Sequence, residues 1–200
     1  MKQTNTKTII KGILVAGLFS LLGGCIGKSN ANAKDAIKTA DIYSQMREQV
    51  LKITPDQLGI KLTDSKTLLA VLTETGYDRA VATLVTVADG TVSLYFSNGG
   101  GFIGAGQYDR PQKACESFIA FAKAYIGKAA FVKEYPLPSE GAVRFYFITS
   151  GGIFVLEEKE NTLGNNQSPL SPLYFKAQEV ITEARIADEK LRELKSAPSN

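Results

Sequence analysis

The amino-acid sequence predicts an α+β domain in which helices pack on an antiparallel sheet of five to six strands. Stretches with helical spacing of apolar residues alternate with strand-like stretches from residue 35 onward. Two short glycine turns, Asp89-Gly90 and Ser150-Gly151-Gly152, lie between pairs of strand-like stretches and are typical of hairpins. No long linker or internal repeat interrupts this order, so residues 35–195 are predicted to form a single domain.

The first predicted elements are a helix over residues 35–53 and three strands over residues 68–74, 80–88 and 91–97. In the helix, apolar side chains recur every three to four residues, at Ile37, Ala40, Tyr43, Met46 and Val50. The second strand is apolar on both faces, which predicts an interior position in the sheet. The third strand alternates in polarity, which predicts one exposed face that carries Ser93, Tyr95 and Ser97.

The second half is predicted to contain a helix over residues 111–126, a hairpin of strands 141–149 and 152–159, and a final helix over 171–195. Asp109 is the predicted N-cap of the first of these helices. In the final helix, Ser171 is the predicted cap and Pro172 the first helical residue. The resulting order of helices and strands resembles that of profilin-like and roadblock-like domains.

The final helix has an apolar stripe with alternating spacings of four and three residues, as in a coiled coil. Its members are Leu173, Ala177, Val180, Ala184, Ala187, Leu191 and Leu194. Packing of this stripe on the sheet of the same chain is the first interpretation, and self-association through helix 171–195 is the second. The last residues, 196–200, are predicted to form a disordered tail.

Composition excludes several kinds of activity. The chain has 23 basic and 20 acidic residues, and three of the lysines lie within the first 24 residues, which contain no acid. The remainder is therefore charge-balanced, and nucleic acid is not expected as a partner. The absence of histidine excludes Ser-His-Asp and Cys-His catalysis and removes the commonest transition-metal ligand. No catalytic constellation, metal site or cofactor is predicted.

The N-terminus carries the most specific motif. Lys2, Lys7 and Lys11 precede the apolar run Gly12 to Leu22, which is about half the ~20 residues that a transmembrane helix needs. This arrangement is typical of a secretory signal peptide over residues 1–24. The sequence "LGGC", ending at Cys25, resembles the lipobox of bacterial lipoproteins. That resemblance implies diacylglyceryl attachment to Cys25, cleavage before it, and acylation of the new N-terminus, for example with palmitate.

The lipobox implies a location in the bacterial cell envelope. Two or more acyl chains anchor a protein stably, since each buried methylene contributes about 0.8 kcal/mol. Residues 25–34, the lipidated cysteine and a small polar tether, are expected to be flexible and to hold the domain close to the bilayer. Ile26 follows the cysteine, in place of the aspartate of an inner-membrane retention signal, which favours the outer membrane in a two-membrane bacterium.

A glycine-rich loop is the one candidate ligand site. Gly99, Gly101 and Gly104 match the G-x-G-x-x-G spacing of a dinucleotide-binding turn. The strand before this loop belongs to a hairpin, however, and "AGQYDRP" separates Gly104 from the next helix, so backbone turning is the favoured interpretation. Gly104 and Gly106 are expected to let another backbone pass closely. The alternative is an anion-binding nest followed by a helix N-terminus, formed by Gly99, Gly100, Gly101, Gly104, Gly106, Asp109 and Arg110.

Three further features have structural interpretations. Cys115 lies on the apolar face of its helix and is predicted to be a small buried side chain and not a reactive thiol. Tyr95 and Tyr146 fall on the polar sides of their strands, where they are expected to cover the sheet surface or to form an aromatic patch. Residues 157–161, "EEKEN", are expected to form a solvated, charged strand end.

Two functional hypotheses remain from the sequence alone. The first is a membrane-tethered module that binds an unknown protein or small anionic ligand in the envelope. The second is a small envelope enzyme that uses carboxylate, tyrosine or lysine chemistry at the loop from Gly99 to Arg110. The stretches "SLYFSNGGGFIGAG" and "PLSPLYFKAQEVITEAR" resemble a group of uncharacterised bacterial proteins, and this resemblance implies no activity.

Overall fold

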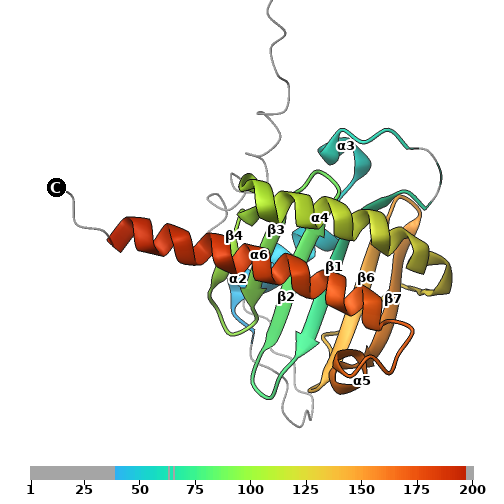
Figure 1. The fold of residues 1–200 in the computed structure, drawn as a ribbon. Coiled ribbons are helices and arrows are strands. Elements are labelled where there is room, and N and C mark those ends of the chain that lie inside the picture. Colours follow the sequence, from blue (N-terminus) through green and yellow to red (C-terminus); the bar gives the residue numbers. More distant parts are fainter. Residues whose placement is uncertain (1–38, 63, 65, 197–200) are drawn as a thin grey trace, which may run out of the picture. The chain divides into compact units, whose positions relative to one another are not determined.

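One antiparallel sheet of seven strands organises the part of the chain that the computed structural model describes, residues 39–62, 64 and 66–196 (Figure 1). The predicted signal peptide, Cys25, the tether and residues 197–200 lie outside the described residues. The strand order is β4-β3-β2-β1-β6-β7-β5. The strands are β1 (Leu68–Gly76), β2 (Val81–Val87), β3 (Val92–Phe96), β4 (Gly101–Ile103), β5 (Ala130–Val132), β6 (Ala142–Thr149) and β7 (Gly152–Lys159).

The helices lie before, between and after two groups of strands. They are α2 (Asp41–Leu51), α3 (Pro55–Leu58), α4 (Asp109–Ala122), α5 (Glu160–Gly164) and α6 (Ser171–Ser196), with 3-10 turns η3 (Ala105–Gln107) and η4 (Lys123–Lys128). Figure 1 shows α4 and α6 side by side across one face of the sheet, with α2 behind it. The α+β class and the antiparallel sheet with helices packed against it are thus confirmed.

Both faces of the sheet carry a hydrophobic core. On one face, Phe118 of α4 and Leu173 of α6 pack with Val71, Phe145 and Phe147 of the central strands. On the other, a second core joins α2, α3 and the opposite side of the same strands, at Tyr43, Val50, Leu58, Leu72, Val85 and Tyr146. All nine residues of β1 are buried, because this central strand is covered from both sides. The interior position predicted for strand 80–88 is confirmed in β2.

The expected strand number was too low, because two strands have only three residues each. β4 pairs with β3 through Gly101–Ile103, and β5 pairs with β7 through Ala130–Val132. Such short segments show no alternation that a sequence pattern could reveal. Both lie at the edges of the sheet, where short strands limit pairing with other chains.

The predicted exposed face of the third strand is wrong. Ser93, Tyr95 and Ser97 are buried, with exposed fractions of 5%, 2% and 0%, while Phe96 is partly exposed. The aromatic ring of Tyr95 packs edge-on against Tyr43 of α2, with ring centroids 5.5 Å apart. Helix α2 therefore covers the side of β3 that the polarity pattern of the strand predicted to face solvent.

The hairpin turns form as predicted. Gly90 has φ +88° and donates its N–H to the carbonyl of Val87 at 2.9 Å, closing the turn between β2 and β3. Gly152, at φ +128°, is the first residue of β7 and pairs with Thr149 directly after the turn at Ser150-Gly151. The helix predicted over 111–126 begins two residues earlier, with Tyr108 as its N-cap, so Asp109 is the first helical residue and not the cap.

Candidate functional site

The glycine-rich loop turns the chain between β3 and β4. Gly99, Gly100 and Gly101 have φ values of +102°, +83° and +139°, a region that residues with a side chain rarely adopt. Across this turn, the N–H of Gly99 donates to the carbonyl oxygen of Phe96 at 3.0 Å, and the N–H of Phe96 donates to the carbonyl oxygen of Gly100 at 3.2 Å. A Cβ at Gly101 would lie 2.5 Å from the carbonyl oxygen of Leu94, so this glycine also permits close contact between the two strands.

The two later glycines have different roles. Gly104 has φ +82° and open space around it, and so it does not carry the close backbone contact expected there. At Gly106, a Cβ would lie 2.1 Å from the carbonyl oxygen of Gly90, so this residue lets the η3 turn pass close to the backbone of the β2–β3 hairpin, as predicted. Phe102 packs against the core, whereas Ile103 is 47% exposed. The loop follows an antiparallel hairpin strand, unlike a dinucleotide-binding turn.

Arg110, the cation of the proposed anion nest, contacts helix α6. Its Nη2 donates to Oε1 of Glu183 at 2.8 Å, and its Nε lies 2.7 Å from Oε2 of the same carboxylate. Residue 110 is in the first turn of α4, and this ion pair connects α4 with α6. The guanidinium is therefore neutralised within the chain, which weakens its attraction for an outside anion.

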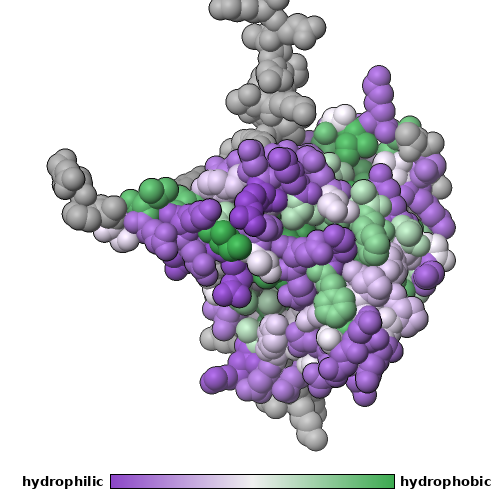
Figure 2. Space-filling model, in the orientation of Figure 1, coloured by the Kyte–Doolittle hydropathy of each residue, from purple (hydrophilic) through white to green (hydrophobic). Residues whose placement is uncertain are grey.

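A groove of about 740 Å³ runs beside this ion pair, between α4 and α6. Its lining combines an apolar surface from Ala114 and Phe175 with charged and amide groups, and Phe175 is 41% exposed. The remaining lining residues are Arg110, Lys113, Gln178, Glu179, Thr182 and Glu183. Figure 2 shows that the face carrying the two helices is largely hydrophilic, with hydrophobic patches among the charged groups.

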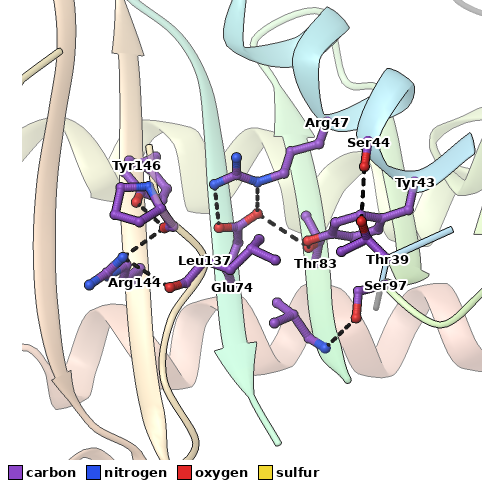
Figure 3. A network of polar contacts seen from close by, with 12 residues as sticks. Thr39, Tyr43, Ser44, Arg47, Glu74, Thr83, Ser97, Leu137, Arg144 and Tyr146 are labelled. Carbon is purple, nitrogen blue, oxygen red and sulfur yellow. Dashed lines mark hydrogen bonds and ion pairs between the residues drawn. The ribbon is translucent and has the colours of Figure 1, made fainter. Parts of the chain in front are cut away.

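A buried ion pair lies on the opposite face of the sheet (Figure 3). Nε and Nη2 of Arg47 donate to the two carboxylate oxygens of Glu74, at 2.6 and 2.9 Å. Glu74 is on the central strand β1 and its side chain is fully buried, while the side chain of Arg47, on α2, is 12% exposed. Burial lowers the pKa of Arg47, but the hydrogen bonds and charge of Glu74 outweigh this and raise the pKa overall.

Hydroxyl groups extend this ion pair into a network. Thr83 donates from Oγ1 to Glu74 at 3.3 Å and lies within hydrogen-bond distance of the Tyr43 hydroxyl, at 2.9 Å (Figure 3). Burial, and then the charge of Glu74, raise the pKa of Tyr43 well above its usual value. The Tyr95 hydroxyl is buried beside the network and has no hydrogen-bond partner among the described residues. Tyr95 and Tyr146 are thus core residues on non-adjacent strands, which contradicts the expected surface patch.

A second hollow, of about 510 Å³, lies next to this network. Arg144 and Tyr146 hold its rim in place, since both side chains donate to the carbonyl oxygen of Pro136, at 2.7 and 2.6 Å. Arg144 also pairs with Glu157, the one member of the charged segment 157–161 that lines the hollow. Arg144 and Glu157 are therefore engaged in structural contacts.

Sequence reasoning missed the Arg47–Glu74 pair. The available signal was a single acid in the mostly apolar run "LLAVLTETG", which forms the central strand β1 in the structure. A carboxylate in that position requires a cationic partner. The partner could not be identified from the sequence because Arg47 lies on a helix and 27 residues away.

Cys115 is buried, as predicted. Its thiol lies 3.4 Å from the carbonyl oxygen of Val87, and burial raises its pKa to about 12. Within the described residues, no three His, Cys, Asp or Glu side chains are grouped so that they could hold a metal ion. None of the helices in this part of the chain is both long and apolar enough to cross a membrane.

Comparisons with family models, with curated proteins and with solved structures gave no match to this chain. The class that the observations define is an α+β domain with a two-sided antiparallel sheet, an amphipathic groove on one face and a buried ion pair on the other.

Proposed function

We propose that the protein is a bacterial lipoprotein whose α+β domain is held at the cell envelope by acyl chains on Cys25. The observation that carries this proposal is the "LGGC" motif after a short basic and apolar leader. In a two-membrane bacterium, Ile26 after the cysteine favours the outer membrane. From the order of the elements alone, we also propose a profilin-like or roadblock-like arrangement for the domain.

Metabolic labelling tests the anchor. The full chain, expressed in a bacterial host with labelled palmitate, is expected to incorporate the label and to enter the detergent phase on Triton X-114 separation. Cys25→Ser should abolish both properties. Cys115→Ser is the matched control, because this thiol is buried and should not affect labelling. An unlabelled wild-type chain that remains in the aqueous phase would contradict the proposal.

We further propose that the domain is a binding module and that the groove between α4 and α6 binds a segment of a protein partner. The groove offers an apolar surface, including the partly exposed ring of Phe175, between charged helix sides. An amphipathic helix binds such a surface by laying its apolar face on the apolar part of a groove. Neutralisation of Arg110 by Glu183 makes a small free anion the weaker candidate.

Site-specific photo-crosslinking in intact cells tests the groove. A photoreactive residue at Gln178, inside the groove, is expected to form a discrete adduct that disappears when Phe175→Asp is added. The control position is Asp56, which is exposed on α3 and is not in the groove. Equal adducts from both positions, or adducts that persist in the Phe175→Asp variant, would contradict binding at this groove.

A further inference from the structure

The chain enters the described domain at one edge of the sheet. The backbone N–H of Ala40, directly before α2, donates to the carbonyl oxygen of Ser97 at 2.8 Å. Ser97 follows β3, and β3 pairs with the edge strand β4. The segment that connects Cys25 to the domain therefore joins it at the end of the sheet formed by β3 and β4.

Helix α6 passes over the same edge and continues beyond it (Figure 1). It has 26 residues, which correspond to a length of about 39 Å. Seven strands in one sheet span about 29 Å, so a helix that crosses them from the β7 side must extend past β4. The apolar stripe is buried from Leu173 to Ala184, but Leu194 in the projecting end is 76% exposed.

Large apolar side chains gather on the elements of this edge. In addition to Leu194, three large apolar side chains here are exposed to solvent: Ile42 at the start of α2, Phe96 of β3 and Ile103 of β4, with exposed fractions of 39%, 37% and 47%. Figure 2 shows hydrophobic surface along the projecting end of α6. The turn formed by Gly99 and Gly100 lies between β3 and β4 and has open space around both residues. Exposed apolar surface of this kind is found where a protein contacts a membrane or another protein.

We propose that the β3–β4 edge and the projecting end of α6 contact the surface of the bilayer that holds the acyl chains of Cys25. This inference rests on the proposed lipid anchor. Residues 26–39 reach at most about 49 Å when fully extended and attach at this edge, so the bilayer is the apolar phase nearest to it. Basic and acidic residues are nearly balanced over residues 185–196, so apolar contact and not attraction to anionic lipid should hold the edge at the surface.

Fluorescence of introduced tryptophans tests this orientation, because the chain contains no tryptophan of its own. The variants are Leu194→Trp on α6 and Phe96→Trp on β3. The matched control is Phe131→Trp on β5, which lies at the opposite edge of the sheet and is 54% exposed. Each lipidated full-length variant is reconstituted into phosphatidylcholine vesicles with and without brominated acyl chains, which quench tryptophan at the interface.

Emission from the Leu194→Trp and Phe96→Trp variants is expected to shift to shorter wavelength and to lose intensity on brominated vesicles, equally at low and high salt. Emission from the Phe131→Trp variant should remain unquenched. An acylated, vesicle-bound chain without quenching at 194 and 96, or with equal quenching at all three positions, overturns the proposed orientation and leaves the anchor intact. A chain that carries no acyl group and stays free of the vesicles overturns the anchor itself.

Discussion

Arg47 forms two hydrogen bonds to the carboxylate of Glu74 across the boundary between α2 and the centre of the sheet, at 2.6 and 2.9 Å. The acid is fully buried and is contributed by the strand, while the base is contributed by the helix. Because a buried charge without a partner is strongly unfavourable, this pair fixes the position at which α2 packs on the sheet.

Arg47→Met should lower the free energy of unfolding by about 3–5 kcal/mol, because it leaves the Glu74 carboxylate buried and unpaired. The double variant Arg47→Met/Glu74→Leu should recover most of this loss, since it removes both charges and keeps similar volumes. Urea denaturation of the wild type, both single variants and the double variant measures the coupling. Additive losses without recovery would show that the two side chains act independently.

Tyr43→Phe and Tyr95→Phe should differ, although both rings lie in the same core. The Tyr43 hydroxyl is within 2.9 Å of Thr83, so its removal should cost about 1 kcal/mol. The Tyr95 hydroxyl is buried and has no partner in the part of the chain that the structure describes, so its removal should be neutral or stabilising. Thermal unfolding of the two variants gives the comparison. A larger loss for Tyr95→Phe would reveal a partner for that hydroxyl.

Cys115 should make the domain less stable as the pH rises. Burial raises the pKa of its thiol from 9.0 to about 12, so the folded state keeps a proton that the unfolded state releases. Stability from this group is complete below pH 9 and falls by about 1.4 kcal/mol per pH unit between pH 9 and 12. Urea titrations at pH 8 and pH 10 should show a smaller loss for Cys115→Ala than for the wild type. Equal losses would indicate that the thiol ionises in the folded state.

Gly101→Ala should destabilise the domain more than Gly100→Ala. Both positions have positive φ, but only at Gly101 would the new Cβ meet backbone atoms, at 2.5 Å. Gly127→Ala is the control, because that position has open space and no positive φ. Melting temperatures of the three variants test this ranking. A Gly101→Ala variant that melts like the wild type would contradict the role of this residue in the β3–β4 turn.

Arg110→Ala should have only a small effect on stability, about 0–1 kcal/mol, because the side chain is 65% exposed and solvent screens the pair with Glu183. Glu183→Gln should change the stability by a similar amount. The double variant Arg110→Ala/Glu183→Gln should be no less stable than either single variant. Thermal melts with and without phosphate provide the measurement. A phosphate-dependent stabilisation that Arg110→Ala removes would instead support the anion-nest interpretation of the glycine loop.

The sequence revealed those parts of the fold that depend on local patterns. Asp89-Gly90 placed a hairpin correctly because the turn needs positive φ at Gly90, and the cysteine on the apolar face of α4 is buried as its spacing indicated. The apolar stripe from Leu173 to Ala184 packs in the hydrophobic core of the same chain, as the first interpretation of that helix predicted. Self-association through the remainder of the helix stays a prediction.

The errors concern features that depend on contacts far apart in the chain. The side of β3 with Ser93 and Tyr95 was expected to face solvent, because its polarity does not show that α2 covers it. For the same reason, Arg47 could not be assigned to Glu74. In the candidate site, the glycine conformations followed from residue type, whereas the engagement of Arg110 by Glu183 required the packing of α4 beside α6.

Complete enclosure of β1 constrains how this domain can change during evolution. Each of its nine residues is buried, so almost every replacement there alters packing on one layer or the other. New specificities must therefore arise from the outward sides of the helices, the turns and the sheet margins, where substitutions leave the interior intact. Variation among related chains should concentrate in those places, while the sequence of the central strand remains nearly constant.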